Sequence, residues 1–115
     1  MQRNAGKWLE DILTNGNDAL EFLQGKSAAE YAADKALQAM VERKLFIVGE
    51  AVAQLSNAFP AVADKLPEFR DIVAFRNVLA HGYFALDHAR VFDIATFSLP
   101  QLLKGADVAQ LDFSS

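Results

Sequence analysis

The feature of this sequence that most constrains its fold is the recurrence of apolar side chains at every third or fourth position along most of the chain. This spacing places the apolar side chains on one face of an α-helix. Only three prolines and six glycines interrupt the pattern in 115 residues, and no segment alternates convincingly between polar and apolar residues as a strand would. We therefore expect an all-α fold, an up-and-down bundle of four to five helices.

Local signals place the boundaries of the first helices. An apolar stripe over residues 8–23 is followed by Gly25, which is typical of a helix C-terminus. The run Ser27-Ala-Ala-Glu30 matches a capping box, so a helix begins there and either continues or restarts at Asp34.

The longest periodic segment extends from about Lys35 to Asn57 and carries a near-heptad apolar seam. Within it, Phe46, Ile47 and Val48 are consecutive, and three neighbouring side chains cover about 200° of a helix circumference. We expect such a helix to be buried on two sides, one facing the bundle core and the other available to a second subunit. The seam consists of Leu37, Val41, Leu45, Val48, Val52 and Leu55.

Two further helices follow. The first is expected over residues 67–81, with proline in its first turn and Gly82 as its stop. The second is expected to begin near Asp87, as N-cap, and to be kinked or ended by Pro100. We expect residues 1–104 to form a single domain and residues 105–115 a loosely held tail.

Composition excludes several classes of function. Fifteen acidic against eleven basic residues give a net charge of −4, which excludes a globally basic nucleic-acid binder but allows a local basic patch. The absence of cysteine excludes disulfides, thiolate catalysis and cysteine-ligated zinc. The first ten residues lack the apolar run of a signal peptide, and no apolar stretch approaches the roughly 20 residues that cross a bilayer. We expect a cytoplasmic protein that does not associate with membranes.

One short segment gathers side chains that could handle a phosphodiester. Arg76, Asn77, His81 and Tyr83 lie within eight positions. An arginine neutralises phosphate charge, and a histidine transfers protons near neutral pH. His88, seven residues after His81, does not provide the ligand spacing or number of a metal site, so neither a metal nor a cofactor is expected.

The pattern Arg76-Asn77-x-x-x-His81-x-Tyr83 resembles the signature of the HEPN superfamily, in its minimal, toxin-type branch called HepT. Two more segments are similar to that branch. The run Ile47-Val-Gly-Glu-Ala51 resembles its Ile-Gly-Glu-Ala segment, and Leu66-Pro-Glu-Phe-Arg-Asp-Ile72 resembles its Pro-Trp entry to the motif helix, with phenylalanine in the usual tryptophan place.

The resemblance implies an all-α homodimer that acts as a metal-independent ribonuclease. It also implies a partner, a minimal nucleotidyltransferase (MNT) antitoxin that transfers AMP from ATP onto the motif tyrosine. Carried over to this sequence, Arg76 and His81 would be catalytic, Asn77 would support them, and Tyr83 would be the AMPylation site.

Helix geometry independently favours a site shared by two chains. Five residues advance 500° along a helix, which leaves Arg76 and His81 about 140° apart, whereas Asn77 and His81 share a face. A single helix then presents a poor pocket, and two copies facing each other across a two-fold axis would enclose a cleft. We expect the RNA 2′-hydroxyl to attack the adjacent phosphate there, leaving a 2′,3′-cyclic phosphate and a 5′-hydroxyl.

Other charged residues are candidates for supporting roles. Glu50 either holds Arg76 or Arg43 in position or faces water. The candidates to join Arg76 in one RNA-binding patch are Arg43, Lys44, Arg70 and Arg90.

A structural explanation of the motif remains open. Arg76 and His81 could cap a helix end and join a hydrogen-bond network without catalysing anything. The chain would then be a non-catalytic helical partner that binds a nucleotidyltransferase or a nucleic acid.

Overall fold

The computed structural model describes residues 4–81 and 86–112, and within these residues the chain is helical and contains no strand. The expected all-α bundle is therefore confirmed. In chain order the helices are α1 (Ala5–Leu23), α2 (Ala28–Ala33), α3 (Lys35–Ala58), α4 (Pro60–Ala63), α5 (Phe69–His81), α6 (His88–Asp93), a π-helical turn η2 (Ile94–Ser98) and α7 (Leu99–Leu111).

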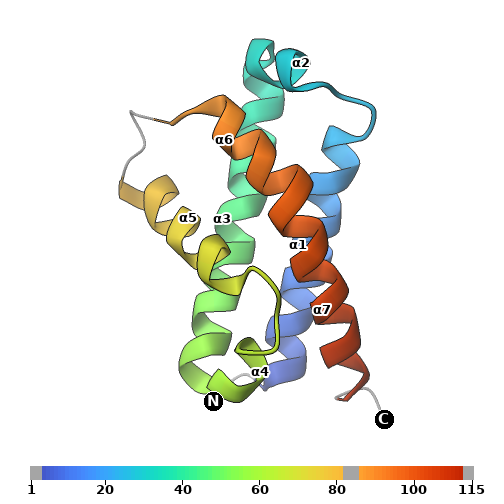
Figure 1. Cartoon of the computed structure of the whole chain (residues 1–115), viewed down its shortest axis with the longest axis vertical. Helices are drawn as coiled ribbons and strands as arrows, with labels where there is room; N and C mark the ends of the chain where they lie inside the picture. Colours follow the sequence, from blue (N-terminus) through green and yellow to red (C-terminus); the bar gives the residue numbers. More distant parts are fainter. Residues whose placement is uncertain (1–3, 82–85, 113–115) are drawn as a thin grey trace.

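The long helices run alternately up and down (Figure 1). Helix α3 lies in the middle, with α1 packed along one side of it and α5 along the other. The α6–η2–α7 segment crosses in front of α3 and returns alongside α1, while the short helices α2 and α4 occupy opposite ends of the bundle. All six residues of the predicted α3 seam are buried in the common core. Helix α3 is thus the element against which the others are positioned.

Several predicted helix boundaries are confirmed, and each depends on a local backbone interaction. Gly25 adopts a φ of 76° just after α1, a conformation that glycine tolerates best. Ser27 and Glu30 form both hydrogen bonds of the capping box. The helix does restart at Asp34, because its carboxylate accepts a hydrogen bond from the backbone N–H of Leu37 at 3.0 Å.

Helix α5 begins at Phe69, two residues later than expected. Glu68 has a φ of 65°, outside the helical region, and its carboxylate accepts a hydrogen bond at 3.1 Å from Ser98, which is buried. Pro67 does not form the first helical turn but packs against Gly105. The start of α5 is therefore fixed by contacts with the end of the chain.

The C-terminal segment differs most from expectation. Of the two outcomes expected at Pro100, an end to the helix is wrong: Pro100 lies in the first turn of α7, directly after the π-helical turn η2 that interrupts the regular α-helix. Helix α7 then continues through Gly105 to Leu111, and Ala106 is fully buried. Residues 105–111 of the expected tail are thus helical, and Ala106 packs into the core. A side chain at Gly105 would collide with Pro67, so glycine lets these two segments meet.

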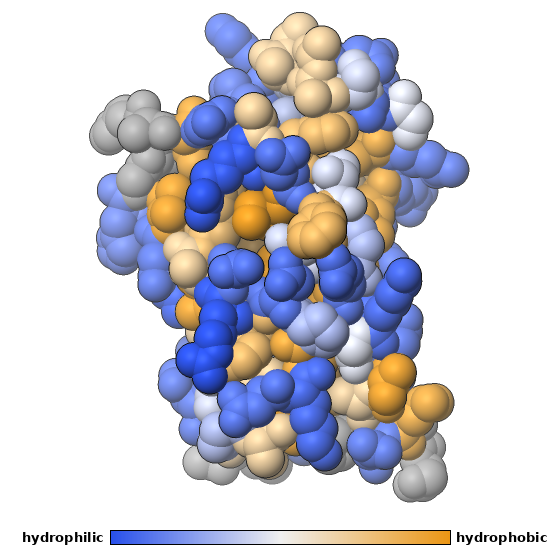
Figure 2. Space-filling view, viewed as in Figure 1, coloured by the Kyte–Doolittle hydropathy of each residue, from blue (hydrophilic) through white to orange (hydrophobic). Residues whose placement is uncertain are grey.

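Across residues 4–81 and 86–112, no helix combines the length and the apolar character needed to span a bilayer. The face shown in Figure 2 is mixed, with hydrophilic side chains interspersed among apolar ones. Apolar atoms appear at its lower right, over the end of α7, where Val108 and Leu111 are exposed.

Candidate functional site

The side-chain stem of Arg76 lies directly against α3 at Gly49. A Cβ atom added to Gly49 would stand 2.8 Å from Cγ of Arg76, and closer still to its Cβ. Because carbon atoms pack at about 3.5–4.0 Å, only glycine at this position lets α5 approach α3 so closely. Gly49 therefore determines where the Arg76 side chain leaves the helix.

Two neighbours hold the guanidinium of Arg76. Its Nε lies 3.0 Å from Oε1 of Glu50, an ion pair whose N–H is not aligned as a hydrogen bond, and its Nη1 donates to Oδ1 of Asn77 at 2.8 Å. The Arg76 side chain is 24% exposed and that of Glu50 is 44% exposed. Nη2 has no partner among the described residues, so the guanidinium has two protein partners and still has donors for a ligand.

His81 is the last residue of α5 and is exposed. It follows Asn77 by one helical turn on the same exposed face, while Arg76 lies at the edge that meets α3. Within the described part of the chain, no hydrogen bond or ion pair occupies the imidazole. Tyr83 and Gly82 lie outside the described residues.

A groove of about 380 Å³ adjoins Arg76 between α3 and α5. Two of its lining residues are arginines, Arg70 and Arg76, and none is acidic. The remaining lining residues are Ala53, Ser56, Asn57, Phe69, Val73, Ala74 and Asn77. The groove is therefore a local basic patch on an acidic protein.

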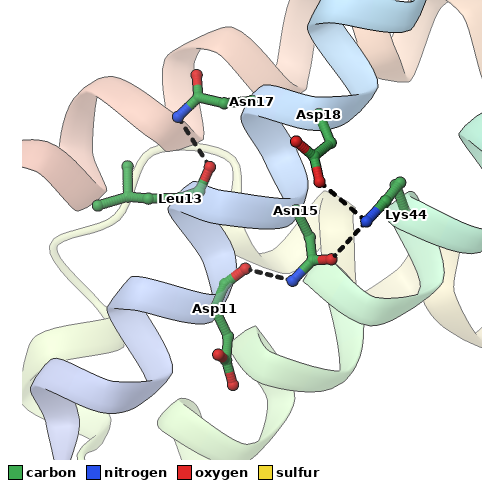
Figure 3. Close-up of polar contacts among 6 residues, drawn as sticks. All are labelled: Asp11, Leu13, Asn15, Asn17, Asp18 and Lys44. Carbon is green, nitrogen blue, oxygen red and sulfur yellow. Dashed lines mark hydrogen bonds and ion pairs between the residues drawn. The ribbon is translucent and has the colours of Figure 1, made fainter.

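Lys44 faces away from this groove. Its ammonium lies 2.9 Å from a carboxylate oxygen of Asp18 and donates to Oδ1 of Asn15 at 3.1 Å (Figure 3). Asn15 in turn donates to the backbone carbonyl of Asp11. Since six residues separate Lys44 from Glu50, the two side chains leave α3 about 120° apart. Lys44 thus joins α3 to α1.

The other two candidate cations also lie outside the groove lining. Arg43 is exposed, two turns before Glu50 on α3. Arg90 lies with its guanidinium carbon 5.8 Å from the centroid of the Phe75 ring, and lines a different depression. Of the four candidate cations, Arg70 shares the groove with Arg76.

A second polar cluster lies at the α2 end of the bundle. The ring of His88 contacts that of Tyr31 edge-on, with centroids 6.1 Å apart, and His88 is half-buried. The Tyr31 hydroxyl is buried without a hydrogen-bond partner among the described residues. Burial raises the pKa of Tyr31. Partial burial likewise raises the pKa of the nearby Glu42 carboxyl. Within the described ranges, no three His, Asp or Glu side chains are grouped so as to hold a metal ion.

Sequence reasoning missed the contributions of Gly49, Ser56 and Asn57. A signal for Gly49 was present, because glycine inside a long helix costs about 1 kcal/mol relative to alanine and is typical of a close approach. For Ser56 and Asn57 there was none, because nothing in the sequence shows which side of α3 meets α5.

Comparison with known proteins places the chain among ribonuclease-like relatives. The family model described as "Ribonuclease HepT-like" matches residues 12–108. A Methanocaldococcus jannaschii protein named "Putative RNase" is 30% identical over 93% of this chain and 97% of its own length. A Caldanaerobacter subterraneus protein with the same designation is 30% identical over 84% and 86%, and the "Probable ribonuclease HepT" of Thermococcus cleftensis is 29% identical over 89% and 92%. No solved structure matches the chain. The chain belongs to the ribonuclease HepT-like family.

Proposed function

We propose that this protein is a metal-independent endoribonuclease that cuts RNA with Arg76 and His81. The observation that carries the proposal is the guanidinium of Arg76, held by Glu50 and Asn77 beside a basic groove, with the exposed imidazole of His81 at the end of the same helix. The names of the relatives support RNA as the substrate.

The reaction needs one proton acceptor, one proton donor and stabilisation of the phosphoryl oxygens. The 2′-oxygen of a ribose forms a bond to the adjacent phosphorus, and the bond to the 5′-oxygen of the next nucleotide breaks. His81 accepts the proton of the 2′-hydroxyl or donates one to the departing 5′-oxygen, and Arg76 donates hydrogen bonds to the non-bridging oxygens. The products are a 2′,3′-cyclic phosphate and a 5′-hydroxyl. Asn77 orients Arg76 through the hydrogen bond it accepts.

A homodimer completes the site in this proposal. Arg76 and His81 leave α5 about 140° apart, so one chain cannot surround a scissile phosphate with both. A second copy related by a two-fold axis would supply the opposite wall of a cleft, and its His81 would take the second proton-transfer role.

Regulation is proposed to act at Tyr83, two residues after His81. A nucleotidyltransferase antitoxin would transfer AMP onto its hydroxyl, and the added phosphate would place a bulky anion near Arg76 and exclude RNA. The chain would then be the toxin of a toxin–antitoxin pair acting in the cytoplasm. Replacing Tyr83 with phenylalanine should leave a nuclease that shows no added AMP by intact mass after co-expression with the transferase. Full labelling of that variant would refute the assignment.

The nuclease proposal is tested with purified protein and single-stranded RNA in the presence of EDTA. We expect cleavage to continue, fragments to carry 5′-hydroxyls, and Arg76→Ala and His81→Ala to be inactive. Lys104→Ala, which removes an exposed cation of α7, serves as the control and should remain active. Fragments with 5′-phosphates, inhibition by EDTA, or an active His81→Ala variant would contradict the mechanism, and equal inactivity of all four proteins would favour a non-catalytic helical partner.

A further inference from the structure

We infer that the groove between α3 and α5 binds the phosphate next to the scissile one in single-stranded RNA, with Arg70 as the cation that holds it. This inference rests on the proposed ribonuclease function and adds to it the path of the substrate away from Arg76. Sequence alone gave four equivalent candidate cations, and the structure separates Arg70 from the other three.

Arg70 is positioned for this role by its neighbour. Its guanidinium carbon lies 5.0 Å from the centroid of the Phe69 ring, and both residues line the groove. A guanidinium stacked on an aromatic ring loses less freedom when it binds a phosphate, and its planar donors match the phosphate oxygens. Arg70 and Arg76 are six residues apart, about 9 Å along the axis of α5 and about 120° around it, and both still line the groove.

The remaining lining of the groove is also suited to a nucleotide. Ser56, Asn57 and Asn77 supply a hydroxyl and two amides that can bond to ribose hydroxyls and base edges, and none of the lining residues would repel a phosphate. By contrast, the depression that Arg90 lines also contains Asp87 and Asp93. Arg70 and Phe69 also border a neighbouring depression that contains Asp64, Glu68 and Asp71. Of the two depressions that Arg70 borders, the α3–α5 groove has no acidic lining residue, so charge favours it for an anion.

The size of the groove favours a single strand. A volume of about 380 Å³ is at the lower end of the range for small-ligand sites and accommodates a nucleotide. A duplex is recognised across successive grooves over a broad surface, which one groove of this volume does not provide. The chemical class of the ligand is thus an unpaired RNA strand.

Binding is best measured on His81→Ala protein, in which the RNA stays intact. In this background we compare Arg70→Ala with the matched control Lys104→Ala by fluorescence anisotropy, using a short single-stranded RNA of mixed sequence at several salt concentrations. Arg70→Ala should weaken binding about five- to tenfold and lower the slope of log K against log salt by about 0.7, the value for one lost phosphate contact on a single strand. Lys104→Ala should change neither.

Two further variants separate the charge from the other contacts. Arg70→Lys should keep the salt slope and recover only part of the affinity, because lysine cannot form the planar pair of hydrogen bonds. Asn57→Ala should weaken binding without changing the slope, because it contacts no phosphate in this arrangement.

Failure of this inference differs from failure of the proposed function. If Arg70→Ala matches Lys104→Ala in affinity and slope while His81→Ala still abolishes cleavage, the groove inference is overturned and the nuclease stands. If His81→Ala continues to cut RNA, the proposed function itself is wrong. If Arg70→Ala weakens self-association in sedimentation without changing RNA affinity, the groove is a contact between subunits, and the inference is likewise overturned.

Discussion

Replacing Gly49 with alanine should separate the stability of this protein from its activity. The new methyl carbon would stand 2.8 Å from Cγ of Arg76, where about 3.5–4.0 Å is needed. The Cβ of Arg76 would be closer still and is fixed to the backbone, so α5 must move away from α3 by about 1 Å. After this shift the guanidinium cannot both keep its contact with Glu50 and stay in its place beside the groove.

The expected magnitudes follow from that displacement. Overpacking a well-packed contact costs about 1–3 kcal/mol, and replacing glycine with alanine inside a helix returns about 1 kcal/mol. The free energy of unfolding should thus fall by about 0–2 kcal/mol, leaving the chain folded. A 1 Å misplacement of an aligned catalytic group lowers the rate about 100-fold, which is the loss we expect in kcat for Gly49→Ala.

Gly16 provides a matched control. It is also a buried glycine inside a long helix, and a Cβ there would stand 2.5 Å from Cδ2 of Leu103, on the side of the bundle formed by α1 and α7. The end of a leucine side chain yields more easily than a Cβ, so Gly16→Ala should lower stability in urea unfolding by no more than Gly49→Ala does, and it should leave RNA cleavage intact. Equal kcat in Gly49→Ala and Gly16→Ala would refute the role given to Gly49.

Three further substitutions have defined outcomes. Glu50→Gln should tighten RNA binding, because it removes a negative charge next to the groove. It should lower kcat by up to about fivefold, because a half-exposed ion pair contributes about 1 kcal/mol or less. Steady-state kinetics with unchanged KM and kcat would contradict this. Tyr31→Phe removes a buried hydroxyl that has no hydrogen-bond partner among the described residues, so Tm should stay constant or rise by a few degrees. A large decrease in Tm would mean that the hydroxyl does form a hydrogen bond. Burial raises the pKa of Glu42 above its ordinary 4.5, so the folded chain keeps this proton to higher pH than the unfolded chain does. The stability that this proton contributes is fully present below pH 4.5 and is lost as the pH rises through the raised pKa of the folded chain. Glu42→Gln should therefore unfold at a higher urea concentration than the wild type at about pH 7 but not at about pH 4.

The parts of the fold that the sequence predicts depend on interactions within a few residues. Gly25, Ser27 and Asp87 each act on the backbone of their own turn, so their effects are readable without knowing what lies across the core. The start of α5 and the length of α7 are different, because both depend on the contact between Pro67 and Gly105, which only the folded chain brings together.

The candidate site divides in the same way. Arg76 and His81 could be identified because their residue types and spacing belong to one helix. Arg70 and Lys44 could not be ranked as RNA-binding candidates from the sequence. Arg70 lines the groove and Lys44 pairs with Asp18 because α3 lies between α5 and α1, and the sequence does not show that arrangement. The direction of a charged side chain is therefore the information that the sequence lacked here.

The modest burial of α5 has a consequence for how the molecule opens. Only Ile72 and Phe75 of this helix are buried, whereas ten residues of α3 are, and α5 packs mainly on α3. Its amide protons should therefore exchange with deuterium earlier than those of α1 and α3, in local opening events that leave the rest of the bundle intact. A partner that captured the opened helix could silence the protein without unfolding it.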